Sequence, residues 1–358
     1  MHIPDGYLSP STCAVLYAGA GVGWYGALRR LKRAFMTRLI PLISVFAAFS
    51  FVLMMFNLPL PGGTTGHAIG VTVAAIVLGP SGAILAISLA VTIQALFFGD
   101  GGITTLGANC FNMAIVGSLV AYATYRLVAT GARIASRRRL VGAAVAGYLA
   151  ANAAAFVAAI EFGIQPILFH NANGVPLYAP YPLSIAIPAM MIGHLAVAGI
   201  AEAVIAAGLV AYLQVADPSL LRGTSGLPES GTLRLQPAPQ KSLRKLWITV
   251  ALLMLLTPLG ILAGGTAWGE WSTNRVNAAG YKEIAPGSQT LPQPSAAPAG
   301  LQRLSSLWTA PIPNYAPQFV KSPSFGYLLS AMFGVGLLIV SSLLLQRLWQ
   351  SRRAAGQP

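Results

Sequence analysis

Residues 183–213 read LSIAIPAMMIGHLAVAGIAEAVIAAGLVAYL, and this apolar stretch decides the class of fold. Its only acidic, basic or imidazole side chains are His194 and Glu202. A helix needs about 20 predominantly apolar residues to cross a bilayer, so the stretch predicts a membrane-spanning helix. The whole chain agrees, because 55% of its 358 residues are hydrophobic and 8% are charged, against roughly 25% charged in soluble domains. We therefore expect an all-α polytopic membrane protein.

Further apolar runs occur along the rest of the chain. They cover Ser11–Leu28, Leu39–Leu58, Ala68–Leu78, Ala83–Phe98, Phe111–Val128, Leu140–Ile160, Leu246–Gly264 and Tyr327–Leu345. The run Ala68–Leu78 has 11 residues before the sequence GPSG and alone would suit a re-entrant element. We count it as a span, because two basic clusters, Arg29 to Arg38 and Arg126 to Arg139, should lie on the same side of the membrane.

Basic residues set the predicted topology. Besides these two clusters, they gather in residues 214–245 and in the carboxyl-terminal tail. The positive-inside rule places all four groups in the cytoplasm. The chain then has nine spans in the cytoplasmic (inner) membrane, with its amino terminus outside and its carboxyl terminus inside. Because the clusters alternate with apolar runs, the net charge of +14 reflects topology and not nucleic-acid binding.

A polar stretch divides the chain into two parts. Residues 215–245 are rich in Pro, Gly and Ser, which is typical of a linker. We expect a seven-helix domain over 1–214, a cytoplasmic linker over 215–245 and a two-helix hairpin over 246–358. The outer loop of the hairpin, 268–323, contains SQTLPQPSAAPAG and APIPNYAP. Its proline content predicts a mobile loop without a packed core of its own.

The amino terminus, MHIPDGYLSP, carries one of only four histidines at its second position. The α-amine of Met1, the backbone nitrogen of His2 and the Nδ1 atom of His2 can close on one metal ion in a plane. His67, in LPLPGGTTGHAIG, lies on the same side of the membrane and could supply a fourth nitrogen, although a plain loop histidine is the alternative. Four nitrogens in a plane favour Ni(II) or Cu(II) over zinc, magnesium or calcium. We therefore predict a metal site of Met1, His2 and His67.

Polar residues near these ligands are expected to support them. In FFGDGGITTLGANCFNMA, the glycines allow tight turns, and Thr105 and the two asparagines could hydrogen-bond the imidazoles. A turn capped by the Asp5 carboxylate should fold the amino-terminal arm back toward the bundle. The expected supporting residues are Asp5, Thr65, Asp100, Asn109 and Asn112.

The remaining ionisable groups are assigned lesser roles. His194 and Glu202 lie two helical turns apart on about one face. Buried ionisable residues in spans often mark function, but the chain has only eight acidic residues, too few for a proton relay. We favour a structural or partner-contact role for both. His170 is interpreted as a loop histidine.

Two absent motifs limit the function. The chain has no GxxxxGK[ST] phosphate-binding loop, so any ATP-driven transport needs a separate ATPase. It also has no HExxH sequence, which argues against an intramembrane metalloprotease. A proton-coupled secondary carrier remains an alternative that would work without an ATPase.

The motifs together resemble a known family. The stretches MHIPDGYLSP, MFNLPLPGGTTGHAIG and LFFGDGGITTLGANCFNMA, with His194 and Glu202, are similar to the NikM/CbiM substrate-capture components of energy-coupling-factor (ECF) transporters for nickel and cobalt. The likeness covers about residues 1–215. The segment TPLGILAGGTAWGEW resembles the small NikN or PDGLE-type component that is often fused behind NikM.

The resemblance implies a function and partners. Its members bind a divalent cation through the groups present here at Met1, His2 and His67, and they carry it as substrate without a catalytic cofactor. They work with a transmembrane coupling subunit of the NikQ/CbiQ type and an ATPase of the NikO/CbiO type. The chain would then be a transport component and not an enzyme. Nickel and cobalt members share the site pattern; the planar nitrogen set and the NikN-like part favour nickel, with cobalt as the alternative.

Overall fold

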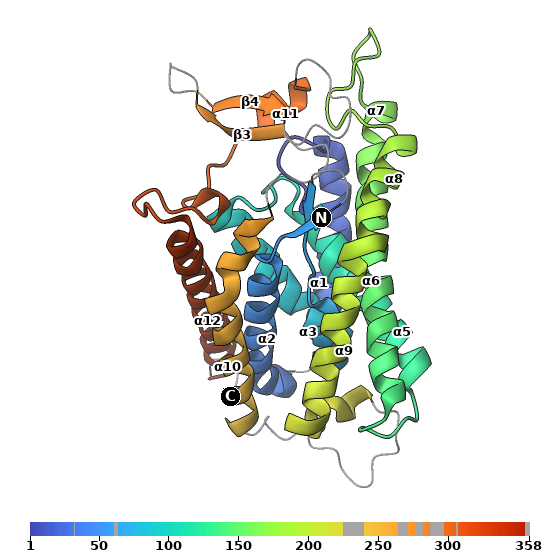
Figure 1. Cartoon of the computed structure of the whole chain (residues 1–358), viewed down its shortest axis with the longest axis vertical. Coiled ribbons are helices and arrows are strands. Elements are labelled where there is room, and N and C mark those ends of the chain that lie inside the picture. The colour runs from blue at the N-terminus through green and yellow to red at the C-terminus, as the bar shows by residue number, and fades with distance from the viewer. Residues whose placement is uncertain are drawn as a thin grey trace.

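The protein, described by a computed structural model, is a bundle of long helices (Figure 1). The structure describes residues 1–31, 33–60, 64–224, 240–263, 271–276, 282–286, 297–305 and 307–354. The longer helices are α1 (Pro10–Arg30), α2 (Arg33–Met54), α3 (Val71–Ile93), α5 (Gly117–Ala129), α6 (Arg137–Gly163), α8 (Leu183–Gly193), α9 (Gly199–Ala216), α10 (Gln240–Leu256) and α12 (Pro323–Ala354). Short ones are α4 (Leu106–Asn109), α7 (Gln165–Leu168) and α11 (Ala299–Leu304).

Irregular helical turns extend several of these helices. Three π-helices are η1 (Gln94–Phe98), η2 (Cys110–Val116) and η3 (His194–Ala198). Three 3₁₀ turns are η4 (Pro218–Thr224), η5 (Thr257–Leu262) and η6 (Pro313–Tyr315). Because π-helices often occur at functional sites, the residues of η1, η2 and η3 merit attention.

The helices have the length and composition that a membrane requires. Within the described ranges, six helical stretches are long and apolar enough to span a bilayer. They are Val71–Phe98, Leu106–Ala129, Arg137–Leu168, Leu183–Ala216, Leu243–Leu262 and Pro323–Arg347, and Leu39–Met54 is a shorter apolar helix. Each apolar run named from the sequence lies largely or wholly in a helix. The prediction of a mainly helical, polytopic membrane protein is confirmed.

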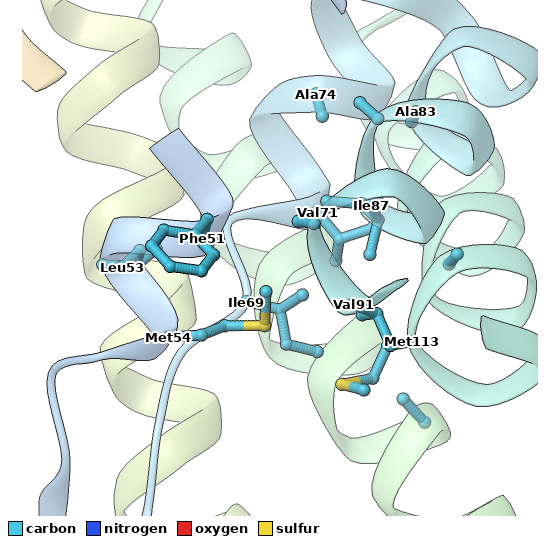
Figure 2. Close-up of a cluster of buried hydrophobic side chains, with 14 of the residues drawn as sticks. Phe51, Leu53, Met54, Ile69, Val71, Ala74, Ala83, Ile87, Val91 and Met113 are labelled. Carbon is cyan, nitrogen blue, oxygen red and sulfur yellow. The ribbon is translucent and has the colours of Figure 1, made fainter. Parts of the chain in front are cut away.

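Helix α3 contains two arms that fold back on each other. Gly79, with φ 71° and ψ 170°, is not helical, and Pro80 follows it. His67, just before α3, and Gln94, just after it, both contact His2. A straight helix would separate the ends of α3 by about 35 Å, so the chain must reverse at Gly79. Figure 2 shows the arms, with Ala74 near Ala83 and Val71 near Ile87. The predicted runs Ala68–Leu78 and Ala83–Phe98 correspond to these arms.

The reversal builds much of the apolar core. Val71, Ala74, Ala83, Ile87 and Val91 are all buried. They pack in one continuous cluster with side chains from α2 and η2. Small residues such as the two alanines let the arms approach closely. The core thereby fixes both ends of α3 at the same end of the bundle.

The two ends of the bundle differ in composition. One end, which we call the site end, carries the amino-terminal residues, α11 and two small hairpins (Figure 1). The other, which we call the basic end, carries Arg29 and Arg30 at the end of α1 and Arg137 to Arg139 at the start of α6. Arg139 is fully buried there and donates to the Tyr125 hydroxyl at 3.0 Å and the Leu221 carbonyl at 3.2 Å.

Short strands lie among the connections at the site end. Strands β1 (Leu58–Leu60) and β2 (Thr64–Gly66) pair antiparallel, and so do β3 (Trp271–Val276) and β4 (Lys282–Pro286). The expectation of an all-α protein therefore holds for the long apolar segments and not for these connections. The first hairpin leads directly to His67.

The carboxyl-terminal part packs on the rest of the bundle. Helices α10 and α12 both contact α2, and the three helices lie on the same side of the bundle in Figure 1. The loop predicted over 268–323 lies partly outside the described residues, but Trp271, Leu301 and Tyr315 in it are buried. The described parts of the loop therefore pack on the bundle, a contact that the expectation of a mobile loop did not include. Their aromatic and aliphatic side chains pack against apolar side chains at the site end. This contact joins distant parts of the sequence, so the sequence did not predict it.

Candidate metal centre

The amino-terminal arm, residues 1–9, folds into the bundle, and its first residues are buried there. Met1 and His2 are each 8% exposed, and Ile3 is fully buried. Ser9 ends the arm, because its Oγ atom accepts a hydrogen bond from the backbone nitrogen of Thr12 at 3.1 Å and caps α1. A buried terminus of this kind needs partners for its backbone polar groups.

Those partners come from the segment between α3 and α5. The Asn109 side chain accepts from the Ile3 nitrogen at 2.8 Å and donates to the Ile3 carbonyl at 3.1 Å. The Gly102 nitrogen and the Thr105 hydroxyl donate to the same carbonyl. The Asp5 carboxylate accepts from the backbone nitrogens of Ile103 and Thr104 at 3.1 and 2.7 Å. The arm is therefore fixed residue by residue, with His2 in the interior.

The two predicted histidines meet in that interior. Nδ1 of His2 lies 3.1 Å from Nε2 of His67, and the ring centroids are 4.9 Å apart. His67 Nδ1 lies 3.1 Å from the Ala68 carbonyl, which can only accept a hydrogen bond. This assigns the ring hydrogen of a neutral His67 to Nδ1 and leaves the lone pair of Nε2 facing His2.

The environment keeps both imidazoles neutral. Burial, and then the positive charge of the chain's amino terminus, lowers the pKa of His2 to about 3. Burial, the amino terminus and His2 lower the pKa of His67 well below its usual value of 6.5. The amino terminus thus acts on both rings. Neutral imidazole is the form that binds metals.

A polar network surrounds His2 on its other sides. Its Nε2 atom lies 3.2 Å from Oε1 of Gln94, and its Nδ1 atom lies 3.1 Å from Oδ1 of Asp100. The Tyr315 hydroxyl donates to Oδ2 of Asp100 at 2.6 Å and accepts from Nε2 of Gln94 at 3.0 Å. Burial, followed by the charge of Asp100, raises the pKa of Tyr315 well above 10, so its hydroxyl keeps the hydrogen.

Two members of this network were missed from the sequence. Gln94 is the one amide side chain in the run Ala83–Phe98, a signal that could have marked it. Tyr315 stands in a proline-rich stretch with nothing to distinguish it from its neighbours.

The predicted supporting residues differ in what they contact. Asp5 and Asn109 hold the amino-terminal arm, and Asp100 contacts His2 itself. Asn112 instead donates to Oε2 of Glu161 on α6 at 2.8 Å. Thr65 lies in β2 opposite Pro59, two residues before His67. Neither asparagine bonds an imidazole in the way the sequence suggested, because Asn109 is engaged by the backbone of Ile3 and Asn112 by Glu161.

The remaining ionisable residues have structural positions. Both oxygens of the buried Glu202 side chain accept hydrogen bonds from the start of α3, from the backbone nitrogens of Ile69 at 2.7 Å, Gly70 at 2.9 Å and Thr72 at 3.4 Å. A carboxylate at a helix start satisfies free backbone donors and the helix dipole. Glu202 therefore anchors the segment that carries His67. His194 is buried and donates from Nδ1 to the Met190 carbonyl at 2.8 Å, and His170 is an exposed loop residue.

The two histidines alone do not make a complete set of metal ligands. Over the described ranges, no group of three or more His, Cys, Asp or Glu side chains is placed to hold a metal ion. Two imidazole nitrogens face each other, so a cation between them needs further donors. Oδ1 of Asp100 lies 3.1 Å from Nδ1 of His2, and the α-amine of Met1 and the backbone nitrogen of His2 lie on the same buried arm.

Comparisons with known proteins place the chain in a family. A family model described as "Cobalt uptake substrate-specific transmembrane region" matches residues 2–220. The chain is 52% identical over 340 residues to a "Fused nickel transport protein NikMN" of Rhodobacter capsulatus, covering 95% of each chain. It is 30% identical to a "Cobalt transport protein CbiM" of Geobacter sulfurreducens, covering 76% of this chain and 74% of that protein.

A solved structure is also similar. A crystal structure of a truncated transition metal transporter has 51% identity to this chain and a TM-score of 0.55, covering 60% of this chain and 98% of that one. Relatives of this kind are metal transport proteins, which fits a transporter rather than an enzyme. The chain is therefore a multi-pass membrane component of nickel or cobalt transport, and it belongs to the family of cobalt uptake substrate-specific transmembrane regions.

Proposed function

We propose that the chain is the substrate-capture component of an ECF-type importer that takes up Ni(II). The ion is held by the Met1 amine, the backbone nitrogen and Nδ1 of His2, and Nε2 of His67. One observation carries the proposal: Nδ1 of His2 and Nε2 of His67, the imidazole nitrogens that this chelate needs, face each other at 3.1 Å in a buried site.

The geometry of the nitrogens supports a shared ion. With metal–nitrogen bonds of about 2.0 Å, adjacent nitrogens of a square plane are about 2.8 Å apart and opposite ones about 4 Å apart. The separation of 3.1 Å is close to the distance for adjacent positions. A planar set of nitrogens suits Ni(II), and the fused relative named for nickel spans nearly the whole chain. Co(II) is the alternative substrate.

The proposal also assigns a role to each part of the chain and a side of the membrane to each end of the bundle. Residues 1–214 form the metal-binding domain, 215–245 a cytoplasmic linker and 246–358 a NikN-like part. The site end faces outward from the inner membrane and the basic end faces the cytoplasm, as the positive-inside rule favours. A transmembrane coupling subunit and an ATPase supply the energy, because this chain has no phosphate-binding loop.

The amino-terminal chelate can be tested by one added residue. A glycine placed before Met1 moves the α-amine away from His2, so high-affinity binding should be lost in isothermal titration with Ni(II) and Co(II). The matched control is a glycine added after Pro358. Unchanged affinity of the amino-terminally extended protein would remove the chelate from consideration.

The coupling to ATP needs a second experiment. Vesicles that contain this chain with its coupling subunit and ATPase should take up labelled nickel only with ATP. Uptake by the chain alone that collapses with the proton gradient would instead favour a proton-coupled carrier.

A further inference from the structure

Tyr315 reaches the metal centre from the carboxyl-terminal part, beyond the residues 2–220 that match the family model. Its ring is buried, stacks on Phe98 with centroids 4.7 Å apart and meets Tyr327 edge-on at 5.5 Å. The Tyr315 carbonyl accepts from the Ser330 hydroxyl at 2.8 Å. The surrounding contacts thus hold this tyrosine in one orientation.

The backbone at this point is unusual. Asn314 and Tyr315 have φ values of 55° and 58°, in the left-handed region that L residues other than asparagine and aspartate rarely adopt. The same segment is tied to η1, because the Ile312 nitrogen donates to the Phe97 carbonyl and the Trp308 indole to the Leu96 carbonyl, each at 2.9 Å. The carboxyl-terminal part is therefore hydrogen-bonded to the helical turn that carries Gln94.

The hydrogen bonds of Tyr315 have only one consistent direction. A carboxylate only accepts, so the single hydroxyl hydrogen of Tyr315 goes to Asp100. The Tyr315 oxygen must then accept from the amide nitrogen of Gln94. This orientation turns Oε1 of Gln94 toward Nε2 of His2. Oε1 is an acceptor and favours the ring hydrogen on Nε2 of His2, whereas Oδ1 of Asp100, 3.1 Å from Nδ1, is an acceptor on the other side of the ring. The hydrogen bond from the Tyr315 hydroxyl to Oδ2 weakens the Asp100 carboxylate as an acceptor. Both contacts of Tyr315 therefore favour the hydrogen on Nε2 over Nδ1.

The hydrogen on Nε2 determines the state of Nδ1 in the same His2 ring. A neutral imidazole has one ring hydrogen, so a hydrogen on Nε2 leaves Nδ1 with a free lone pair. Nδ1 is the atom that faces His67. We propose that Tyr315 is a positioning residue which, through Gln94 and Asp100, fixes His2 in the tautomer that binds the transported ion. This inference rests on the proposed chelate.

The carboxyl-terminal part then has a specific role in capture. Without the Tyr315 hydroxyl, the amide of Gln94 is free to flip and present its NH₂ group to Nε2 of His2. That orientation favours the tautomer with hydrogen on Nδ1, which must be lost before the ion binds. Packing of residues 307–323 on the bundle therefore favours the His2 tautomer that can bind the metal.

A single-atom change tests the role of the hydroxyl. Tyr315→Phe keeps the stacked ring and removes only the oxygen, and nickel affinity by isothermal titration should fall about 10- to 100-fold, the usual cost of losing a group that orients a ligand. The matched control is Tyr327→Phe. Tyr327 belongs to the same ring cluster, but its hydroxyl donates to the Met55 carbonyl at 2.8 Å, so affinity should stay at the wild-type value.

The tautomer itself can be observed without any variant. The chain has four histidines, so nitrogen-15 NMR of histidine-labelled, nickel-free protein in detergent can resolve His2, assigned with a His2→Gln sample. Wild-type protein should carry the hydrogen on Nε2, and Tyr315→Phe should show a mixture. Hydrogen on Nδ1 in the wild type, or equal affinities of the two phenylalanine variants, would overturn the inference.

These outcomes are separable from failure of the proposed function. If wild-type protein binds no nickel, or if His67→Ala binds as wild type, the chelate itself is wrong. If His67→Ala abolishes binding while Tyr315→Phe matches Tyr327→Phe, only the role of Tyr315 is wrong.

Discussion

The site end and the basic end of the bundle offer an ion different surroundings. At the site end, His2, His67, Gln94 and Asn109 are buried and hydrogen-bonded to one another or to the amino-terminal arm. Toward the basic end, a crevice between α2, α3, α9 and α10 is lined by apolar side chains and one hydroxyl. Its lining residues are Val45, Phe46, Phe49, Val73, Leu209, Leu213, Leu246, Thr249 and Val250.

This contrast bears on how an ion crosses. An unpaired charge costs many kcal/mol to place in an apolar interior, so the crevice offers a captured cation no resting place. The ion should stay at the site end until the helices themselves move. The contrast therefore argues against passage of the ion through this crevice, in agreement with delivery by reorientation of the bundle.

The largest effect should come from His67→Ala. The change removes one of four nitrogens and leaves the amino-terminal arm in place, so affinity should fall by roughly 100-fold or more, about 2.8 kcal/mol. Titration calorimetry in detergent measures it. His170→Ala is the control, because His170 lies in an exposed loop and its Nδ1 contacts the Asn171 carbonyl. Similar losses in both variants would mean that the pair of histidines is not the site.

A smaller loss of nickel affinity is expected for Asn109→Ala, and none for Asn112→Ala. Asn109→Ala frees the backbone of Ile3, next to the chelating residues, and should lower nickel affinity about tenfold, since one such contact contributes about 1–1.5 kcal/mol. Asn112→Ala removes the partner of Glu161, so it should lower the melting temperature and leave affinity near the wild-type value. The reverse pattern would show that the support for the arm comes from elsewhere.

These two asparagines also show where sequence reasoning reaches its limit. The apolar runs located the helices, and the structure places Nδ1 of His2 3.1 Å from Nε2 of His67. Asn109 and Asn112 looked equivalent, being three residues apart on a helix. In the structure, η2 begins at Cys110 and widens the turn between them, which changes the direction of the second side chain. No composition or spacing signal reveals such a turn.

The partners of His2 were hidden for another reason. Gln94 becomes a neighbour of His2 only because α3 reverses at Gly79, and the sequence was interpreted as two separate crossings without their packing. Tyr315 lies 313 positions from His2 along the chain, in a loop whose proline content suggested mobility. Contacts of this kind depend on tertiary packing, which local patterns do not encode.

Acidification should lower the stability of the nickel-free protein. The pKa of His2 is about 3 in the folded protein against 6.5 ordinarily. Its contribution to stability is therefore complete above pH 6.5 and is lost as pH falls toward 3. The unfolding free energy should decrease by at most about 1.4 kcal/mol per pH unit for this group. Thermal unfolding at pH 7.5 and pH 5 measures the slope, and His2→Gln should make it shallower; an equal slope would contradict the assignment.

The smallest effect on affinity should come from the crevice itself. Leu213 is buried in its wall, so Leu213→Ala should destabilise the protein by about 2–5 kcal/mol through the cavity it leaves. The site end does not depend on that side chain, and distant, unconnected changes combine additively, so nickel affinity should stay within about twofold of the wild-type value. Calorimetry and thermal unfolding on the same sample separate the two quantities. A large loss of affinity would mean that the two ends are coupled even before any partner binds, and the crevice would then belong to the capture mechanism.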